Sequence, residues 1–296
     1  MVRAAQMKFP IPKEELFYSG HTACPGCGAA LALKYVLKGL GPRTIIVIPP
    51  SCAGTISASF PFSSLKIPVL RIPFETTAIS ASGIRAALDA MGKTDIHVLG
   101  WAGDGGTFDI GLQALSAAAE RNDNILYVCY DNEAYMNTGI QRSSATPEST
   151  WTTTTPSPYV KNTPKKDIIR IMAAHKIPYI ATASVGYPPD LIKKVEKAKE
   201  KVGTKFILIF SPCPTGWRYS SEMTIRIAKL ATETGIFPLY EIEDGEKYTL
   251  SRKHGQKPLK EYFSLQGRFR NLKEEDLRRI EEKVRKEQDY LARMTG

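Results

Sequence analysis

Two short motifs in this 296-residue chain combine glycine with side chains that can bind a divalent cation. The first, Gly103-Asp104-Gly105-Gly106, follows an apolar run and precedes a helical pattern. Glycines at a strand-to-helix turn let the backbone approach a phosphate, and the helix dipole favours the negative charge there. Because the carboxylate of Asp104 repels a phosphate, a divalent cation between the two groups is the natural arrangement.

The second motif supplies further oxygen atoms for such a cation. Asn132 stands 28 residues after Asp104, just after the next apolar run. Adjacent parallel strands place their carboxyl ends at one edge of a sheet, where ligands of open α/β folds bind. An Asp carboxylate, the amide oxygen of Asn132 and the backbone carbonyl of Ala134 would give Mg²⁺ three protein ligands. The alternative is that 132–138 is only a polar turn, but the two motifs together are more specific than either alone.

Cysteine forms a third group with possible chemistry. Cys24 and Cys27 precede a helical pattern, whereas Cys52 and Cys213 stand alone in turns rich in Pro and Gly. Loops at one sheet edge could bring these four thiols together to hold zinc or a four-iron cluster. A redox pair of the C-x-x-C type is the other possibility, although it leaves Cys52 and Cys213 unexplained. Cys129 lies inside an apolar run and is predicted to be a buried hydrophobic residue.

Composition is that of an ordinary globular protein. The chain is 43% hydrophobic and 24% charged, and no apolar stretch is long enough to cross a membrane. Pro10 and Pro12, followed by charged residues, do not fit a secretory signal, so we expect a cytoplasmic protein without a membrane partner. The four histidines show no ligand-like spacing and are predicted to be structural or solvated.

The positions of these motifs require a particular fold. Short β-branched runs alternate with helical patterns, which is typical of a doubly wound, mostly parallel sheet with helices on both faces. Strands are predicted at 44–48, 69–74, 96–101, 125–130, 179–184 and 206–210. Helices are predicted at 28–39, 78–91, 108–121, 166–175, 190–202 and 220–234.

Two segments depart from this alternation. The segment 139–165 is rich in Ser, Thr and Pro, and its length predicts a lid or binding loop that Trp151 and Tyr159 could dock; a disordered linker is the alternative. From about residue 245 a polar connector leads to an amphipathic helix at 272–294. We therefore divide the chain into an α/β domain, 1–250, and a C-terminal extension, 251–296.

The extension is strongly basic. It holds 13 Lys or Arg and 8 Asp or Glu, a net charge of +5 out of +10 for the whole chain. Such a bias could serve nucleic acid, a membrane surface or an acidic protein, or it could be a solvated helix face. A basic zinc-binding module that binds nucleic acid therefore remains a second hypothesis for the chain.

The motifs together resemble those of one known family, the β subunits of thiamine diphosphate-dependent 2-oxoacid:ferredoxin oxidoreductases, and most closely its pyruvate branch. The resemblance covers about residues 20–270. It rests on A-C-P-G-C-G at 23–28, Cys52, G-D-G-G-T-F-D-I-G-L-Q-A-L-S at 103–116, D-N-E-A-Y-M-N-T-G-I-Q-R-S-S at 131–144 and C-P-T-G-W at 213–217. It implies a thiamine diphosphate-binding fold of the diphosphate-binding type.

The resemblance also implies a role for each motif. Asp104, Asn132 and the carbonyl of Ala134 would hold Mg²⁺ on the diphosphate, which Gly103, Gly105 and Thr138 would line. Cys24, Cys27, Cys52 and Cys213 would ligate a 4Fe-4S cluster, whose potential the backbone N–H groups around Gly26 and Gly28 would tune. Asn137 would lie beside the reacting carbon and orient the 2-oxoacid.

The implied reaction needs further components. A 2-oxoacid would lose CO₂ on thiamine diphosphate, pass electrons to the cluster and then to ferredoxin, and give its acyl group to coenzyme A. An α subunit would contribute a glutamate and most substrate contacts, beside a subunit with ferredoxin-like clusters and a γ-type subunit. Pyruvate is the expected substrate, with 2-oxoisovalerate or oxalate as alternatives. On this interpretation the basic extension contacts a subunit or an acidic partner, and no nucleic acid is expected.

Overall fold

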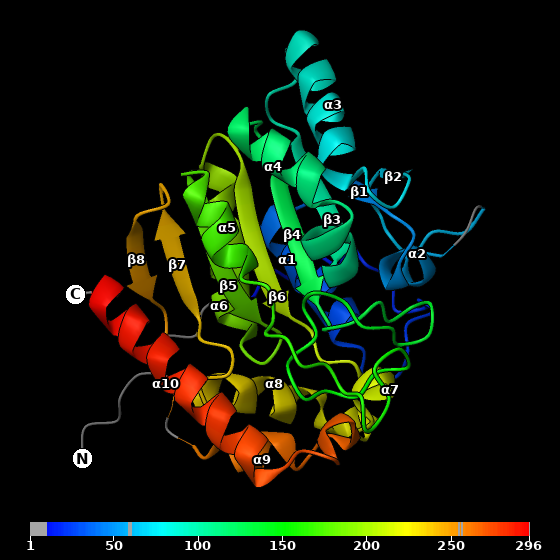
Figure 1. Ribbon diagram of the computed structural model, residues 1–296. Coiled ribbons are helices and arrows are strands. Elements are labelled where there is room, and N and C mark those ends of the chain that lie inside the picture. The colour runs from blue at the N-terminus through cyan, green and yellow to red at the C-terminus, as the bar shows by residue number, and fades with distance from the viewer. Residues whose placement is uncertain (1–10, 59–60, 254, 256, 296) are drawn as a thin grey trace, which may run out of the picture.

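The computed structural model describes residues 11–58, 61–253, 255 and 257–295. Most of the segment in which a secretory signal would lie, residues 1–10, is outside this range. Within it, no helix combines the length and the apolar character that a membrane crossing needs. Figure 1 shows a central sheet with helices in front of it, behind it and along one end.

The sheet has eight strands in the order β2-β1-β3-β4-β6-β5-β7-β8. The strands are β1 (Thr44–Ile48), β2 (Val69–Arg71), β3 (His97–Gly103), β4 (Leu126–Asp131), β5 (Tyr179–Ser184), β6 (Lys205–Phe210), β7 (Tyr240–Glu243) and β8 (Lys247–Leu250). The first six are parallel, and β7 and β8 continue the sheet as antiparallel strands. The predicted doubly wound, mostly parallel fold is confirmed.

The central strands are apolar on both faces because helices cover both faces. Alternate residues of β3 and β4 enter different apolar cores: Leu99 and Val128 enter one, and Val98 and Cys129 enter the other. Side chains of successive strand residues point to opposite sides, so a strand between two helical layers needs apolar residues throughout. Cys129 is fully buried, as predicted.

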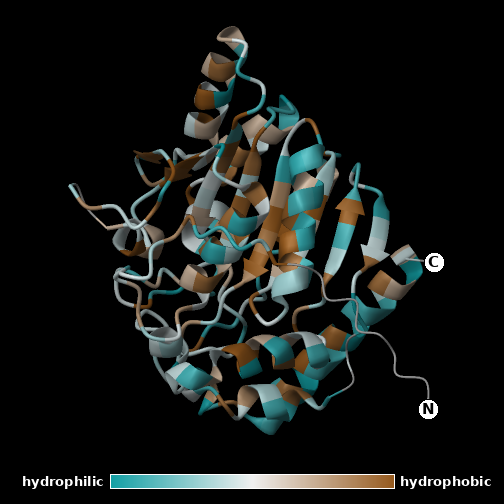
Figure 2. Ribbon diagram, turned by 180° about the vertical axis from the view of Figure 1, so that it is seen from behind, coloured by the Kyte–Doolittle hydropathy of each residue, from teal (hydrophilic) through white to brown (hydrophobic). Residues whose placement is uncertain are grey.

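Ten α-helices complete the two layers and the lower end of the molecule as drawn. They are α1 (Gly28–Leu40), α2 (Cys52–Ile56), α3 (Thr77–Ala90), α4 (Leu112–Glu120), α5 (Ile168–Ala174), α6 (Pro188–Glu200), α7 (Pro214–Trp217), α8 (Thr224–Glu233), α9 (Leu259–Phe263) and α10 (Glu274–Thr295) in the described part of the chain. Helices α1 and α6 pack together on one face, and α3 and α4 on the other. Figures 1 and 2 show α8, α9 and α10 beyond the carboxyl ends of the parallel strands.

Two of the bounds that differ from the sequence-based prediction have a clear physical reason. The strand predicted at 69–74 ends at Arg71, before Pro73, which lacks the N–H that a ladder needs. The helix predicted at 108–121 is split into a π-helical turn, Gly105–Asp109, and α4. An added Cβ at Gly111 would lie 2.1 Å from the carbonyl oxygen of Gly106, so this close turn requires glycine.

The predicted polar connector contains an antiparallel hairpin instead. Strands β7 and β8 are joined through Asp244 and Gly245, both with positive φ, 52° and 73°. Asp-Gly between two alternating runs is a strong hairpin signal, because both turn positions favour residues that tolerate the left-handed region. The signal was present in the sequence and was overlooked.

The C-terminal residues pack into the same apolar core as the sheet. Leu259, Tyr262, Phe263, Phe269 and Leu291 are all buried in the cluster that contains α8. Helix α10 packs against β8, and only Leu291 of its described residues is buried. The other faces of α10 are exposed to solvent and hold most of its charged side chains.

Candidate functional site

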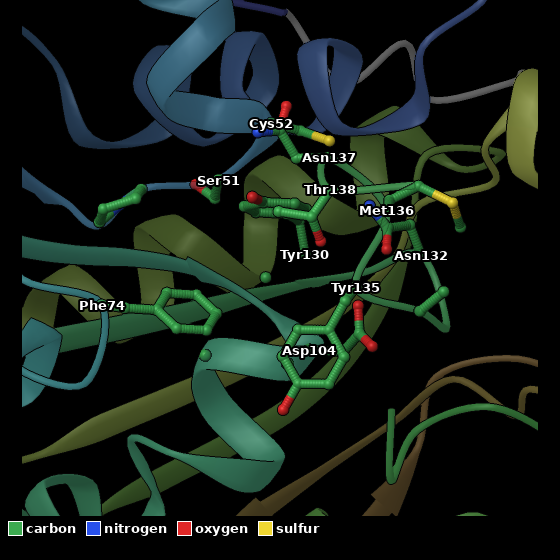
Figure 3. A pocket seen from close by; sticks show the side chains of 15 residues that line it. Ser51, Cys52, Phe74, Asp104, Tyr130, Asn132, Tyr135, Met136, Asn137 and Thr138 are labelled. Carbon is green, nitrogen blue, oxygen red and sulfur yellow. The ribbon is translucent and has the colours of Figure 1, made fainter. Parts of the chain in front are cut away.

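A pocket of about 290 Å³ lies at the carboxyl ends of β1, β3 and β4. The six residues predicted for the diphosphate and magnesium site line it, as does Asn137, which is predicted to orient the 2-oxoacid: Gly103, Asp104, Gly105, Asn132, Ala134, Thr138 and Asn137. In Figure 3, Cys52 and Asn137 lie toward one side of the view, and Asp104 and Tyr135 toward the other. The topology therefore brings together two motifs that are 28 residues apart.

Three oxygen atoms converge at the base of this pocket. The amide oxygen of Asn132 lies 2.9 Å from Oδ1 of Asp104 and 3.0 Å from the carbonyl oxygen of Ala134. Three acceptors in contact repel one another unless a cation lies among them, or unless the amide turns over so that its nitrogen donates to both neighbours. Magnesium with ligands at 2.0–2.1 Å separates adjacent oxygens by about 2.8–3.0 Å, so these spacings fit a magnesium ion.

Asp104 has a negative charge that no cationic side chain of the described residues compensates by a salt bridge. Its side chain is buried, and its Oδ2 accepts a 2.5 Å hydrogen bond from the hydroxyl of Ser143. Burial and the neighbouring Asp131 raise the pKa of Asp104 well above its usual value. A buried carboxylate in this position is stabilised by a bound cation.

The loop that carries Asn132 is held by a buried group of four charges. Lys165 forms ion pairs with Asp131 and Glu133, and Arg268 forms a 2.7 Å ion pair with Glu133. Burial raises the pKa of Asp131 to about 6, against the effect of Lys165. Burial also opposes ionisation of Glu133, but Lys165 and Arg268 outweigh it and the pKa is lowered. At neutral pH the two carboxylates and two cations compensate one another.

Arg268 also connects this loop to the turn after β6. Its guanidinium stacks over the ring of Trp217 at 3.6 Å from the ring centroid. The indole N–H of Trp217 in turn donates to the carbonyl oxygen of Asn132, at 2.8 Å. Trp217 closes α7, the short helix that begins directly after Cys213. The stacked side chains of Arg268 and Trp217 thus connect the loop that carries Asn132 to the turn that carries Cys213.

The glycines of the first motif make room for aromatic rings. An added Cβ at Gly105 would lie 2.4 Å from the ring of Tyr135, so no larger residue fits there. An added Cβ at Gly103 would lie 3.1 Å from the ring of Tyr130. These glycines therefore keep the backbone and the pocket floor open where a diphosphate would bind.

The two remaining predicted residues lie at the more exposed side of the pocket. Oδ1 of Asn137 accepts a 3.3 Å hydrogen bond from Thr55, and the hydroxyl of Thr138 donates to Oε1 of Gln141 at 2.6 Å. Asn137, Asn132 and Cys52 line both this pocket and the one that adjoins it. They form the boundary between the two.

The adjoining pocket contains the four predicted cluster cysteines: Cys24, Cys27, Cys52 and Cys213. The N–H of Gly28 donates to the carbonyl oxygen of Pro212 at 3.1 Å, which ties the C-x-x-C turn to the Cys213 turn. An added Cβ at Gly28 would lie 2.6 Å from that same oxygen, so glycine allows the two turns to touch. The predicted convergence of the thiols is confirmed.

Partial burial favours the neutral form of Cys52 and Cys213 in the absence of a metal. It raises the pKa of Cys52 to about 12 and that of Cys213 to about 11, and the neighbouring thiols add to the effect at both sites. In the described range, no group of three or more His, Cys, Asp or Glu is arranged to hold a metal ion.

The N–H of Gly28 itself is not available to a sulfur atom, because it is bonded to Pro212, but the hypothesis also covers the N–H groups next to it. Other backbone groups take that role. The N–H of Gly216 donates to Sγ of Cys213 at 3.4 Å, and backbone hydrogen bonds from Ala29 and Ala30 lower the pKa of Cys27 against the larger effect of burial.

The segment 139–165 lies over the metal loop. Thr146 donates to the carbonyl oxygen of Glu133 at 2.7 Å, and Lys165 enters the buried charge group. The prediction that Trp151 docks the segment is confirmed, because Arg218 stacks on its ring at 3.5 Å. Tyr159 was wrongly predicted to do the same, since it is 80% exposed.

Sequence reasoning missed the residues that hold the site in place. Ser51 and Phe74 line the pocket after β1 and β2, and their position at strand ends could have indicated them. Ser143 belongs to the motif at 131–144 but was assigned no role, and Lys165 and Arg268 carried no such signal because they lie far from the motifs in sequence.

Two comparisons identify the class of protein. Residues 75–209 match the family model described as "Thiamine pyrophosphate enzyme, C-terminal TPP binding domain". A 2-oxoglutarate:ferredoxin oxidoreductase from Magnetococcus marinus, solved with 2-oxoglutarate, coenzyme A and succinyl-CoA, has the same fold. Its TM-score is 0.59 at 22% identity, over 77% of this chain and 84% of that one. The chain thus contains the binding domain of a thiamine diphosphate enzyme.

Full-length relatives define the family. The chain is 50% identical to ketoisovalerate oxidoreductase subunit VorB of Pyrococcus furiosus, over 96% of this chain and 94% of that protein. It is 48% identical to pyruvate synthase subunit PorB of Methanothermobacter thermautotrophicus, over 93% of this chain and 96% of that protein. The chain belongs to the β subunits of thiamine diphosphate-dependent 2-oxoacid:ferredoxin oxidoreductases, and it is one subunit of an oxidoreductase complex.

The buried charge group predicts a large effect of Arg268. We expect Arg268→Met to lower the free energy of unfolding by about 3–5 kcal/mol, because it leaves the two buried carboxylates, Asp131 and Glu133, with Lys165 as their one cation among the described residues. Adding Glu133→Gln should recover part of the loss. Chemical denaturation of both variants measures this, with the exposed Arg270→Met as control. Equal stability of Arg268→Met and Arg270→Met would contradict the role assigned to Arg268.

Proposed function

We propose that this chain is the catalytic β subunit that binds thiamine diphosphate through Mg²⁺ and passes electrons to an adjacent 4Fe-4S cluster. The complex would convert a 2-oxoacid, coenzyme A and oxidised ferredoxin to an acyl-CoA, CO₂ and reduced ferredoxin. The single observation that carries the proposal is the pair of adjoining pockets. One contains the Asp104 carboxylate, the Asn132 amide and the Ala134 carbonyl, with the amide within 3.0 Å of the other two; the other contains four cysteines, and Cys52, Asn132 and Asn137 line both.

Magnesium is supported by charge as well as by spacing. Lys165 and Arg268 already compensate Asp131 and Glu133, so Asp104 remains the one carboxylate of this group without a cationic partner among the described residues. With Mg²⁺ bound to Asp104, Asn132 and the carbonyl of Ala134, the remaining ligand positions face the pocket. Diphosphate oxygens and water would fill them.

Bound thiamine diphosphate would supply the carbanion chemistry of decarboxylation, which no amino-acid side chain provides. The chain would then position the cofactor and exclude water. Gly103, Gly105 and Thr138 would line the diphosphate, and the side chain of Asn137 could turn from Thr55 toward the 2-oxoacid. Phe74 and Tyr135 would shield the site from solvent.

A four-iron cluster is supported by the chemistry of the four thiols. The half-buried thiols of Cys213 and Cys52, with pKa values raised to about 11 and 12, ionise only beside a strong positive charge, which iron provides. The chain also belongs to an oxidoreductase family, which favours the cluster over the zinc-binding nucleic-acid module.

The substrate has two candidates. The motifs of the sequence favour pyruvate. A second candidate, 2-oxoisovalerate, is favoured by relatives named for ketoisovalerate, whose identity of 50% is close to the 48% of the pyruvate synthase subunit. We propose that an α subunit completes the pocket with the activating glutamate, and that a γ-type subunit and a subunit with ferredoxin-like clusters complete the complex. The charged outer face of α10 would contact a partner subunit.

The metal assignment predicts a graded loss of cofactor. Asp104→Asn should weaken Mg²⁺-dependent retention of thiamine diphosphate by more than about 100-fold, because a direct ligand contributes more than an outer hydrogen-bond partner. Ser143→Ala should weaken it by about 10–100-fold, because it removes only the hydrogen bond to Asp104. Cofactor content of the gel-filtered complex at varied Mg²⁺ measures both. The exposed Asp95→Asn is the control, and normal retention by Asp104→Asn would refute the assignment.

The cluster assignment predicts opposite results for two cysteines. Cys52→Ser should lose iron, acid-labile sulfide and 2-oxoacid oxidation, because it removes one of four ligands. Cys129→Ser is a matched control: it changes the same atom in the buried core and should retain iron and sulfide while losing some stability. Metal and sulfide analysis of anaerobically purified complex distinguishes these outcomes. One zinc per chain and no iron would instead support the zinc module.

Activity is expected only in the assembled complex. The purified chain alone should not oxidise pyruvate, because the site is shared with an absent subunit. The complex should reduce ferredoxin or a viologen dye with at least one of pyruvate, 2-oxoisovalerate or oxalate when coenzyme A is present. Initial rates across this panel identify the substrate. Rapid pyruvate oxidation by the chain alone would overturn the proposed division of roles.

A further inference from the structure

A second pocket of functional interest lies at the opposite edge of the sheet from the cofactor pocket. It has a volume of about 160 Å³ and is formed by the amino ends of β3 and β6 and the end of α6. This is the upper end of the sheet in Figure 1. Its lining includes five basic side chains, Arg85, His97, Lys199, Lys201 and Lys205, but only one carboxylate, Glu200.

Two of the cations are buried. Lys205 is 5% exposed, and its ammonium donates to Oδ1 of Asn124 at 2.6 Å. It takes part in no salt bridge among the described residues. Its three N–H donors are therefore only partly used by this contact. The side chain of Lys205 is a buried cation with a neutral partner.

Arg85 is 4% exposed and contributes the second buried charge. Its guanidinium donates to the carbonyl oxygens of Ile96 and Lys93, at 2.8 and 2.9 Å, and pairs with Asp89 at 2.7 Å. Its Nε is buried without any hydrogen-bond partner. Buried donors are almost always satisfied, so an unpaired Nε beside a pocket indicates a missing acceptor.

The other charges at the pocket do not supply that acceptor. Lys201 is engaged by Glu243, at 2.8 Å, and Glu200 is exposed. Burial, and then Lys199, Lys205 and Arg85, lower the pKa of His97, and all four residues line the same pocket. Asp95 opposes this effect, but it is exposed and paired with Arg43.

We propose that this pocket binds a small oxyanion of the phosphate or sulfate type. Its oxygens would accept from Lys205 and Arg85 within the pocket and from His97 and Lys199 nearer the surface. Charge-assisted hydrogen bonds from several cations are the usual means of holding such anions. The site is separate from the diphosphate site, because it lies at the other ends of the same strands.

One structural alternative makes a different prediction. Burial and Arg85 lower the pKa of Lys205 to about 7. In this alternative the lysine is uncharged and the pocket holds only water. In that case phosphate has no effect that depends on Lys205. The two interpretations therefore differ in the response of matched variants to anions.

The test locates the anion directly. Crystals of the full chain or its complex are soaked in sodium selenate, and anomalous scattering from selenium marks its position. We expect a peak within hydrogen-bonding distance of Lys205 and His97, and its loss in Lys205→Met. Absence of the peak in the unmodified protein, or an equal peak in the variant, would overturn the proposal.

A solution measurement covers the case in which the variant crystallises differently. Phosphate should raise the midpoint of thermal unfolding of the unmodified complex. Its affinity for the Lys205→Met variant should be lower by a factor of at least about ten. The exposed Lys193→Met is the control, and His97→Gln is a second, milder variant. Comparison of inorganic phosphate with glycerol 3-phosphate distinguishes a free anion from the phosphate of an ester. Equal phosphate responses in all variants would overturn the proposal.

Discussion

The arrangement of the cofactor pocket depends on the compensation of buried negative charge at the carboxyl ends of the strands. Asp104, Asp131 and Glu133 are all buried there, and an uncompensated buried carboxylate is strongly destabilising. Lys165 and Arg268 compensate two of them, and both come from segments outside the sheet that must pack against its edge to reach the site. The third charge is left beside converging oxygens, where a cation fits. Folding of the distant segments and formation of the proposed metal site would thus be parts of one electrostatic requirement.

The same packing joins the two adjoining pockets. Trp217 contacts the carbonyl of Asn132 on one side and follows Cys213 by one short helix on the other, while Arg268 stacks on its ring. The relative position of the metal loop and the thiol pocket is therefore fixed by rigid aromatic packing rather than by long side chains alone. Such fixed spacing suits an oxidoreductase subunit, because electron transfer between two centres requires a short and constant separation. The C-terminal segment contributes to this geometry although it lies far from the motifs in sequence.

Much of the fold and the composition of the site could be predicted from the sequence. The runs that became β1 and β5 were predicted with their final bounds, because apolar residues on both faces identify a buried parallel strand. The motifs around Asp104 and Asn132 and the four distant cysteines were predicted to converge at one edge, and they do. The β7–β8 hairpin and the π-helical turn were missed. The first had a local signal, Asp244-Gly245, whereas the second depends on close contact between glycine backbones.

The sequence by itself determined the family, the alternation of strands and helices, and the residues whose oxygen or sulfur atoms could bind a metal. These properties depend on local patterns and on motifs whose spacing is regular. The tertiary structure alone decided which charges compensate one another, which backbone N–H groups face a sulfur, and which side chains hold Asn132 in place. Gly28 bonds to Pro212 rather than to a thiol, and Arg268 reaches Glu133 across 135 positions of the chain. Such contacts depend on how loops far apart in sequence cross the same sheet edge, and no local pattern encodes that.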